Sequence, residues 1–194
     1  MNWKKRIVSL ALAAVIGLST FLASGVEAEA AGAIAKGIDV SKYQGAINWS
    51  AVAAEGYSFA FIKVGSAKSG LDPYFAANMV GANAAGLKTG VYLYSYATTV
   101  EAAMAEAQFT LAAIAPFTVS MPVVFDLEDA VHKTMTPEQL QALTVVFCSI
   151  IQSAGYQPMV YSSKNWLTQR VGPIPFDVWV AQYAEACDCL LYTS

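Results

Sequence analysis

Two carboxylates stand two positions apart at the end of an apolar run, in the stretch PVVFDLED from Pro122 to Asp129. The run predicts a buried strand, and residues i and i+2 of a strand point to the same face. Asp126 and Glu128 should therefore lie side by side. In a partly dry cleft, repulsion and desolvation raise the pKa of one such acid and leave the other anionic. A proton donor beside a negative charge is what cleavage of a glycosidic bond requires.

Two other interpretations of these acids remain open. Asp126, Glu128 and Asp129 could favour the N-terminus of a following helix through its dipole. Alternatively, Asp39, Asp126 and Glu128 could together bind a hard metal ion. The D-x-E spacing does not choose between them, because the separation of the carboxyl groups in space decides the chemistry.

Strand and helix patterns alternate along the chain and must position these residues. We expect helices at residues 72–86, 99–115 and 136–155, with a helical turn at 47–56. The last helix has Thr136 as its N-cap, Pro137 at its first position and Gln139 completing a capping box. The expected strands are residues 36–43, 59–65, 89–97, 121–128, 158–163 and 178–183.

Repeated strand–helix units predict a parallel sheet covered by helices, either open or closed into a barrel. No glycine-rich phosphate loop follows the first strand, which disfavours a nucleotide-binding open sheet. Active groups of a barrel collect at the carboxyl ends of its strands. Polar residues do fall there, namely Asp39, Lys63, Tyr94, Tyr96, Asp126, Glu128 and Tyr161. We therefore predict an α/β fold and favour a closed TIM-like (β/α) barrel over the open sheet.

Five blocks in order resemble the glycoside hydrolase family 25 lysozymes. They are GIDVSKYQGAINW, FAFIKVGS, DPYFAANMVGANAAGLKTGVYLYSYA, PVVFDLED, and MVYSS with VWVAQY, which together run from about Lys36 to Tyr183. The resemblance implies an irregular TIM-like (β/α) barrel that cuts the β-1,4 link from N-acetylmuramic acid to N-acetylglucosamine in bacterial peptidoglycan. No cofactor and no metal ion is expected.

The resemblance also implies roles for individual residues. Glu128 matches the general acid, Asp126 the acid that stabilises or orients the reacting sugar, and Asp39 an acid that tunes the pair. Whether a carboxylate or the N-acetyl oxygen of the substrate attacks the anomeric carbon stays open. Tyr94, Tyr96 and Tyr161 fall where relatives line the sugar groove. Leu93 stands where many relatives carry histidine.

The remaining candidate residues have plainer interpretations. Lys63 is expected either to pair with Asp39 or Asp126 or to be exposed, and Trp179 to lie either in the core or in the groove. Both are candidate substrate-binding residues. His132, the only histidine, is expected to be a solvated loop residue, and Asp129 a loop or capping acid. We expect the hydrophobic core to contain Trp49, Trp166 and the thiol of Cys148.

The amino terminus has the pattern of a secretory signal peptide over residues 1–30. Lys4, Lys5 and Arg6 precede an apolar run, and small residues follow, with cleavage expected after Ala28 or Ala30. The mature protein should act outside the cell or at the cell wall, with no membrane association after cleavage. The net charge of −3, with no later basic run, argues against nucleic acid as a partner.

The carboxyl terminus suggests an incomplete barrel over residues 33–188. The family pattern should continue past VWVAQY into a further strand that carries an aromatic pair and another acid. Instead the chain ends in CLLYTS, residues 189–194, which a transposase-based sequencing adaptor can encode. We expect those residues to be adaptor-derived.

Two other functions stay open, a non-catalytic peptidoglycan-binding barrel and a chitinase-like glycosidase.

Overall fold

A sheet with six parallel strands forms the centre of the computed structural model, which describes residues 35–181. Its strand order is β1-β2-β4-β5-β6-β7, and the short β3 pairs antiparallel with the end of β2. The bounds are β1 Gly37–Val40, β2 Phe59–Ser66, β3 Gly70–Leu71, β4 Lys88–Tyr94, β5 Val123–Asp126, β6 Pro158–Ser163 and β7 Asp177–Ala181. The six strands expected from the sequence are confirmed, whereas β3 was not anticipated.

Helices connect the parallel strands. They are α1 Trp49–Ala54, α2 Phe75–Ala84, α3 Val100–Ile114, α4 Pro137–Ser153 and α5 Lys164–Trp166, with shorter helical turns at η2 Lys42–Gln44, η3 Ala130–Thr134 and η4 Leu167–Val171. The capping box predicted for α4 is present, because Gln139 accepts from the Thr136 N–H at 2.8 Å and donates its own N–H to the Thr136 hydroxyl at 3.3 Å.

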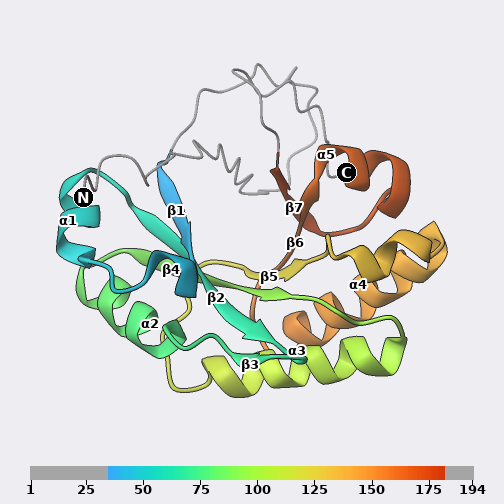
Figure 1. The fold of residues 1–194 in the computed structure, drawn as a ribbon, viewed down its shortest axis with the longest axis horizontal. Helices are drawn as coiled ribbons and strands as arrows, with labels where there is room; N and C mark the ends of the chain where they lie inside the picture. The colour runs from blue at the N-terminus through green and yellow to red at the C-terminus, as the bar shows by residue number, and fades with distance from the viewer. Residues whose placement is uncertain (1–34, 182–194) are drawn as a thin grey trace, which may run out of the picture.

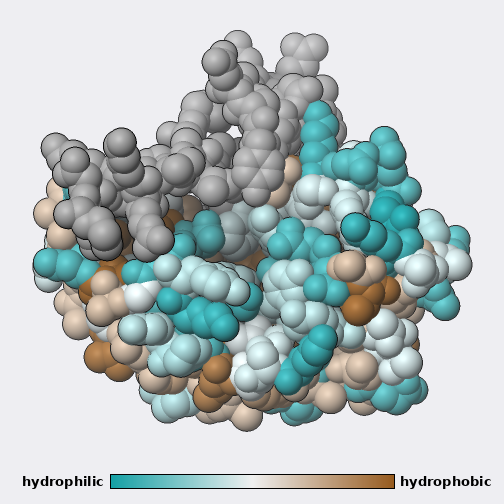
Figure 2. All heavy atoms as spheres, viewed as in Figure 1, coloured by the Kyte–Doolittle hydropathy of each residue, from teal (hydrophilic) through white to brown (hydrophobic). Residues whose placement is uncertain are grey.

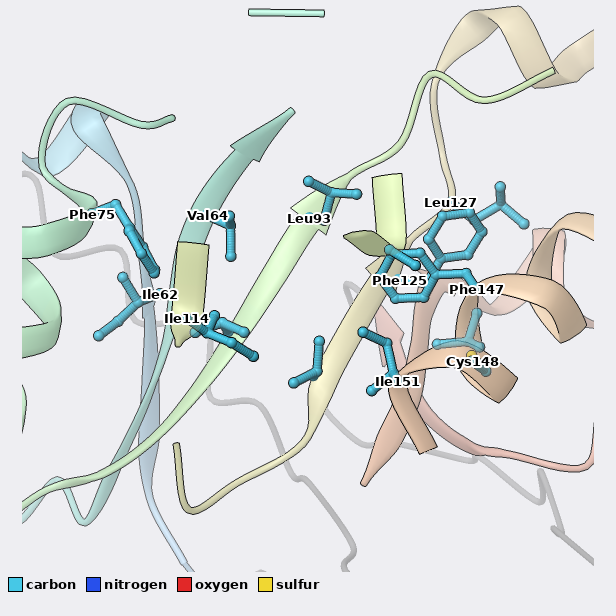
Figure 3. Close-up of a cluster of buried hydrophobic side chains, with 14 of the residues drawn as sticks. Ile62, Val64, Phe75, Leu93, Ile114, Phe125, Leu127, Phe147, Cys148 and Ile151 are labelled. Carbon is cyan, nitrogen blue, oxygen red and sulfur yellow. The ribbon is translucent and has the colours of Figure 1, made fainter. Parts of the chain in front are cut away.

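The main hydrophobic core lies between the sheet and the helices on its outer side (Figure 1). Figure 3 shows how strand residues such as Ile62, Leu93 and Phe125 meet side chains from the helices. The rings of Phe125 and Phe147 stack with their centroids 4.4 Å apart. Each fully buried side chain of this size contributes about 1.5–3 kcal/mol. This layer holds the strands in place and so fixes where they end.

A second, smaller core lies on the other face of the sheet. It contains Phe59, Phe61, Val124, Met159 and Trp179. Phe61 on β2 and Trp179 on β7 share this cluster although three strands lie between them in the sheet, so the sheet is curled. The predicted barrel is therefore confirmed as a partial (β/α) barrel, with β1 and β7 as the edges of the described sheet.

Two expectations for core side chains have different outcomes. Trp49 is buried in the main core, as expected. Trp166 is only half-buried, and the Arg170 guanidinium lies 5.3 Å from its ring centroid, so the prediction of a core anchor was wrong. Arg170 also donates to the Lys133 and Met135 carbonyls, so the guanidinium beside this ring is fixed by the loop before α4.

The outer surface mixes polar and apolar residues (Figure 2). Exposed apolar side chains on the helices, such as Val80, Met104 and Val145, come from different helices. Across residues 35–181, no helix has the length and hydrophobicity needed to cross a bilayer. The predicted signal peptide, Cys187, Cys189 and the last six residues lie outside the described residues.

Candidate active site

A cavity of about 350 Å³ opens at the carboxyl ends of the strands. Seven of the residues singled out from the sequence line it, namely Asp39, Lys63, Tyr94, Asp126, Glu128, Tyr161 and Trp179. They come from β1, β2, β4, β5, β6 and β7 and from the loop after β5. Tyr96 is not among the lining residues, although its ring lies 5.2 Å from that of Tyr94.

The register of the sheet explains why three of these side chains meet. Tyr94 on β4 pairs with Asp126 on β5, and Asp126 pairs with Tyr161 on β6. Residues paired across parallel strands lie level with one another and point to the same face. The buried acid is therefore flanked by a tyrosine on each side.

The two acids of the D-x-E pair occupy different environments. Asp126 is buried, with its Oδ1 atom unpartnered among the described residues, whereas Glu128 is exposed at the rim. Desolvation, and then the charge of Glu128, raises the pKa of Asp126 well above its ordinary value. Desolvation also raises the pKa of Glu128. In the ligand-free protein Asp126 is thus the acid that holds a proton more strongly, and Glu128 the more accessible one.

Lys63 and Asp39 set the remaining charges around the pair. Lys63 lies 4.7 Å from the ring centroid of Tyr94, and its positive charge lowers the pKa of both Asp126 and Glu128. Burial raises the pKa of Asp39, and the charge of Asp39 in turn raises that of Asp126. Three carboxyls facing one lysine cannot all be ionised at low cost, so the cavity retains protons.

Aromatic rings form the walls of the cavity. Tyr161 packs edge-on against Trp179 at 4.7 Å, and Trp179 belongs both to the inner core and to the lining. The hydroxyl of Tyr94 donates to Oδ2 of Asp129 at 3.0 Å, and burial followed by that bond raises the pKa of Tyr94. Flat rings with polar edges suit the faces of sugar units.

Asp129 and His132 lie in the loop that follows the acids. Asp129 accepts from the Val131 N–H at 3.0 Å and begins η3, which confirms the prediction of a capping acid. The prediction that His132 is solvated was wrong. Its side chain is buried, and Nε2 lies 2.9 Å from the Ala97 carbonyl oxygen. Burial lowers the pKa of His132 and favours the neutral ring, whose Nε2–H donates this bond.

Other residues of the site were missed by sequence reasoning. Tyr92 lines the cavity and could have been found, because it stands two positions before Tyr94 on the same face of a strand. Glu106 on α3 is buried and accepts from the Ser95 hydroxyl at 2.6 Å and from the Tyr96 N–H at 2.9 Å. It therefore anchors the loop after β4. Ser41, Tyr43, Gln44 and Ala181 complete the lining.

The metal-ion interpretation receives no support from the geometry. Within the described part of the chain, no group of three or more His, Cys, Asp or Glu side chains is arranged to hold a metal ion. The alternative role of Asp126 and Glu128 at a helix N-terminus is also unsupported, because Asp129 caps η3 and Thr136 caps α4.

Comparisons with known proteins agree with this fold. The profile of Glycosyl hydrolases family 25 matches residues 38–189. The chain belongs to this family of glycoside hydrolases.

Three relatives illustrate the similarity. Lysozyme M1 of Streptomyces globisporus is 45% identical over 60 residues, which is 31% of this chain and 20% of that protein. The modular autolysin LytC of Streptococcus pneumoniae, solved with a synthetic peptidoglycan ligand, superposes with a TM-score of 0.73 at 26% identity over 82% of this chain and 40% of that one. A bacterial lysozyme from Streptomyces coelicolor gives a TM-score of 0.65 at 26% identity, over 76% and 74% of the two chains. The matched regions thus cover 20% and 40% of the first two relatives.

Proposed function

We propose that this chain is a muramidase that hydrolyses the β-1,4 link between N-acetylmuramic acid and N-acetylglucosamine in bacterial peptidoglycan. The observation that carries the proposal is the placement of Asp126 and Glu128 in one cavity walled by tyrosine and tryptophan. Family membership and the lysozymes among the relatives support the same reaction.

The two acids take different catalytic roles and share one proton. Burial raises the pKa of both acids, and the charge of Glu128 raises that of Asp126 further, so the pair holds a single proton over a range of pH. The catalytic form has that proton on Glu128, which is exposed and can reach the glycosidic oxygen. Once Glu128 is neutral its repulsion disappears, and Asp126 can ionise beside the positive charge of Lys63. The anion then faces the positive charge that develops at the sugar carbon.

The site of action follows from the substrate. Peptidoglycan lies outside the cytoplasmic membrane, so the enzyme must be exported to meet it. We propose that residues 1–30 direct this export and are removed, and that residues 33–188 act as the catalytic domain in the cell wall or medium. Amino-terminal sequencing of the exported protein tests the cleavage after Ala28 or Ala30.

Product analysis tests the proposed reaction. Purified cell walls are incubated with the wild type, with Glu128→Gln and with Glu101→Gln, a matched control because Glu101 is an exposed glutamate on α3. Wild type and control should release fragments with muramic acid at the reducing end, identified by mass spectrometry after borohydride reduction, and Glu128→Gln should not. Wall binding without release would indicate a non-catalytic module. Preferential cleavage of chitin oligomers would indicate a chitinase-like enzyme.

A further inference from the structure

Tyr43 presents an exposed aromatic ring at the rim of the cavity. Its side chain is 78% exposed, well above Val80 at 61% and Leu71 at 53%. It nevertheless lines the same cavity as the acids, from the turn η2 that follows β1 at the edge of the sheet (Figure 1). Exposure of this ring contributes little to stability, so the ring is available to contact a ligand in the cavity.

The backbone beneath this ring is held unusually firmly. The N–H of Ser41 donates to the side chain of Gln44 at 2.8 Å, and Gln44 donates back to the Ser41 carbonyl at 3.2 Å. The N–H of Lys42 donates to Oδ2 of Asp72 at 2.9 Å. Asp72 is itself buried and also accepts from the Tyr74 N–H at 2.9 Å, which ties η2 to the start of α2. These hydrogen bonds order the backbone segment that carries the ring.

A preordered aromatic ring at the rim of a saccharide cavity has one obvious chemical use. Stacking on an apolar sugar face needs a flat ring whose backbone does not have to be ordered on binding. Tyr161 and Trp179 supply such rings on the β6 and β7 side of the cavity, and Tyr43 supplies one on the β1 side. The Lys42 ammonium lies 5.4 Å from the Tyr43 ring centroid and would meet the carboxylates that muramic acid carries.

We propose that Tyr43 is the stacking platform of an additional saccharide subsite, which binds a sugar unit of the glycan strand beyond the two that flank the cleaved bond. This inference rests on the proposed function and adds a substrate-length preference to it. The catalytic groups bind a short substrate without this subsite, whereas a longer strand gains the extra contact.

Binding measurements on the full chain test the subsite without requiring hydrolysis. In a Glu128→Gln background, calorimetry compares a peptide-free disaccharide and tetrasaccharide of peptidoglycan for Tyr43→Ala, Tyr43→Phe and the control Tyr74→Ala, whose ring does not line the cavity. One lost aromatic contact should weaken tetrasaccharide binding about two- to tenfold in Tyr43→Ala. Tyr43→Phe and Tyr74→Ala should bind as the background protein does, and the disaccharide should respond less than the tetrasaccharide.

The outcomes separate this subsite from the proposed function. Unchanged tetrasaccharide binding in Tyr43→Ala, or equal weakening in Tyr43→Phe, would overturn the stacking platform while leaving the muramidase intact. Equal weakening for both saccharides would also overturn it, because the ring would then contact the central units. If the background protein binds neither saccharide, the proposed function fails along with the subsite.

Discussion

The indole ring of Trp179 on β7 stacks on the ring of Phe61 on β2, with centroids 4.8 Å apart, although β4, β5 and β6 lie between these strands in the sheet. In a flat sheet, strands with three others between them are about 19 Å apart. The contact is possible only because the sheet curls. The same curl brings Asp39 on β1 to one cavity with Asp126 and Tyr161.

Replacing Trp179 should therefore affect both stability and binding. Trp179→Ala removes a ring that contacts Phe61, Tyr92 and Tyr161 and should lower the free energy of unfolding by about 3–5 kcal/mol. Trp179→Phe should lose less, because most of the apolar contact remains. Urea unfolding followed by circular dichroism measures both. An alanine variant as stable as the wild type would contradict a role for this ring in the inner core.

Asp126→Asn should separate activity from stability. The buried carboxyl has an unpartnered oxygen and a strongly raised pKa, so a neutral amide of similar shape should leave the melting temperature unchanged or raise it. Hydrolysis of cell walls should fall by about three orders of magnitude, because the negative charge facing the sugar carbon is lost. A variant that is both unstable and inactive would instead give Asp126 a structural role.

The stability of the wild type should depend on pH through Asp126. Its folded-state pKa is raised above the ordinary value of 3.8, so the folded protein holds a proton that the unfolded chain has released. This contribution is complete below the unfolded pKa and is lost as the pH rises through the folded pKa. The melting temperature of the wild type minus that of Asp126→Asn should therefore decrease as the pH rises above about 4. A difference that increases with pH would reverse the assignment of the raised pKa.

The activity should show a bell-shaped pH profile with an acidic to near-neutral optimum. One carboxyl of the pair must be ionised and the other protonated, and the pKa values of Asp126 and Glu128 are both raised. The rate of wall hydrolysis, measured as new reducing ends, should fall on the alkaline side as Glu128 loses its proton. A rate that continues to climb above neutrality would contradict a protonated Glu128.

Glu106 should act as a positioning residue for the loop after β4. Glu106→Ala would remove the acceptor of the Ser95 hydroxyl and the Tyr96 N–H, at about 1–3 kcal/mol for each group left unpaired. We expect KM to rise more than kcat falls, because Tyr94 and Tyr96 lose their support. Glu106→Gln should largely rescue both, since its carbonyl oxygen can accept from the Tyr96 N–H. Glu101→Ala, on the same helix but exposed, is the control.

Cys148 should be inert in the folded protein. Its thiol is buried in the main core, where desolvation raises its pKa to about 12. Iodoacetamide should modify it only after denaturation, as read by peptide mass mapping, which separates this peptide from the one with Cys187 and Cys189. Rapid labelling under native conditions would show that the helix α4 opens locally.

Much of the scaffold was decided by local sequence. The six strands and the helices between them follow from hydrophobic runs, and the capping box at Thr136 follows from spacing alone. The two-residue period of a strand predicted that Asp126 and Glu128 lie close together; the structure ends β5 at Asp126 and places Glu128 in the following loop, and both line one cavity. Parallel strands place their carboxyl ends at one edge, so the residue types there predicted a site, and the resemblance to the family 25 lysozymes then chose a glycosidase among the interpretations.

The tertiary structure decided what depends on curl and on contacts between distant segments. Tyr94 and Tyr96 share a strand-end motif, yet only Tyr94 lines the cavity, because Glu106 and His132 hold the loop that begins at Ser95. The polar side chain of His132 can be buried because its Nε2 is hydrogen-bonded to the carbonyl oxygen of Ala97 in another loop. Trp179 serves core and cavity at once because the sheet bends around it. Such placements are set by packing between distant segments, and the local pattern of a single segment does not contain that information.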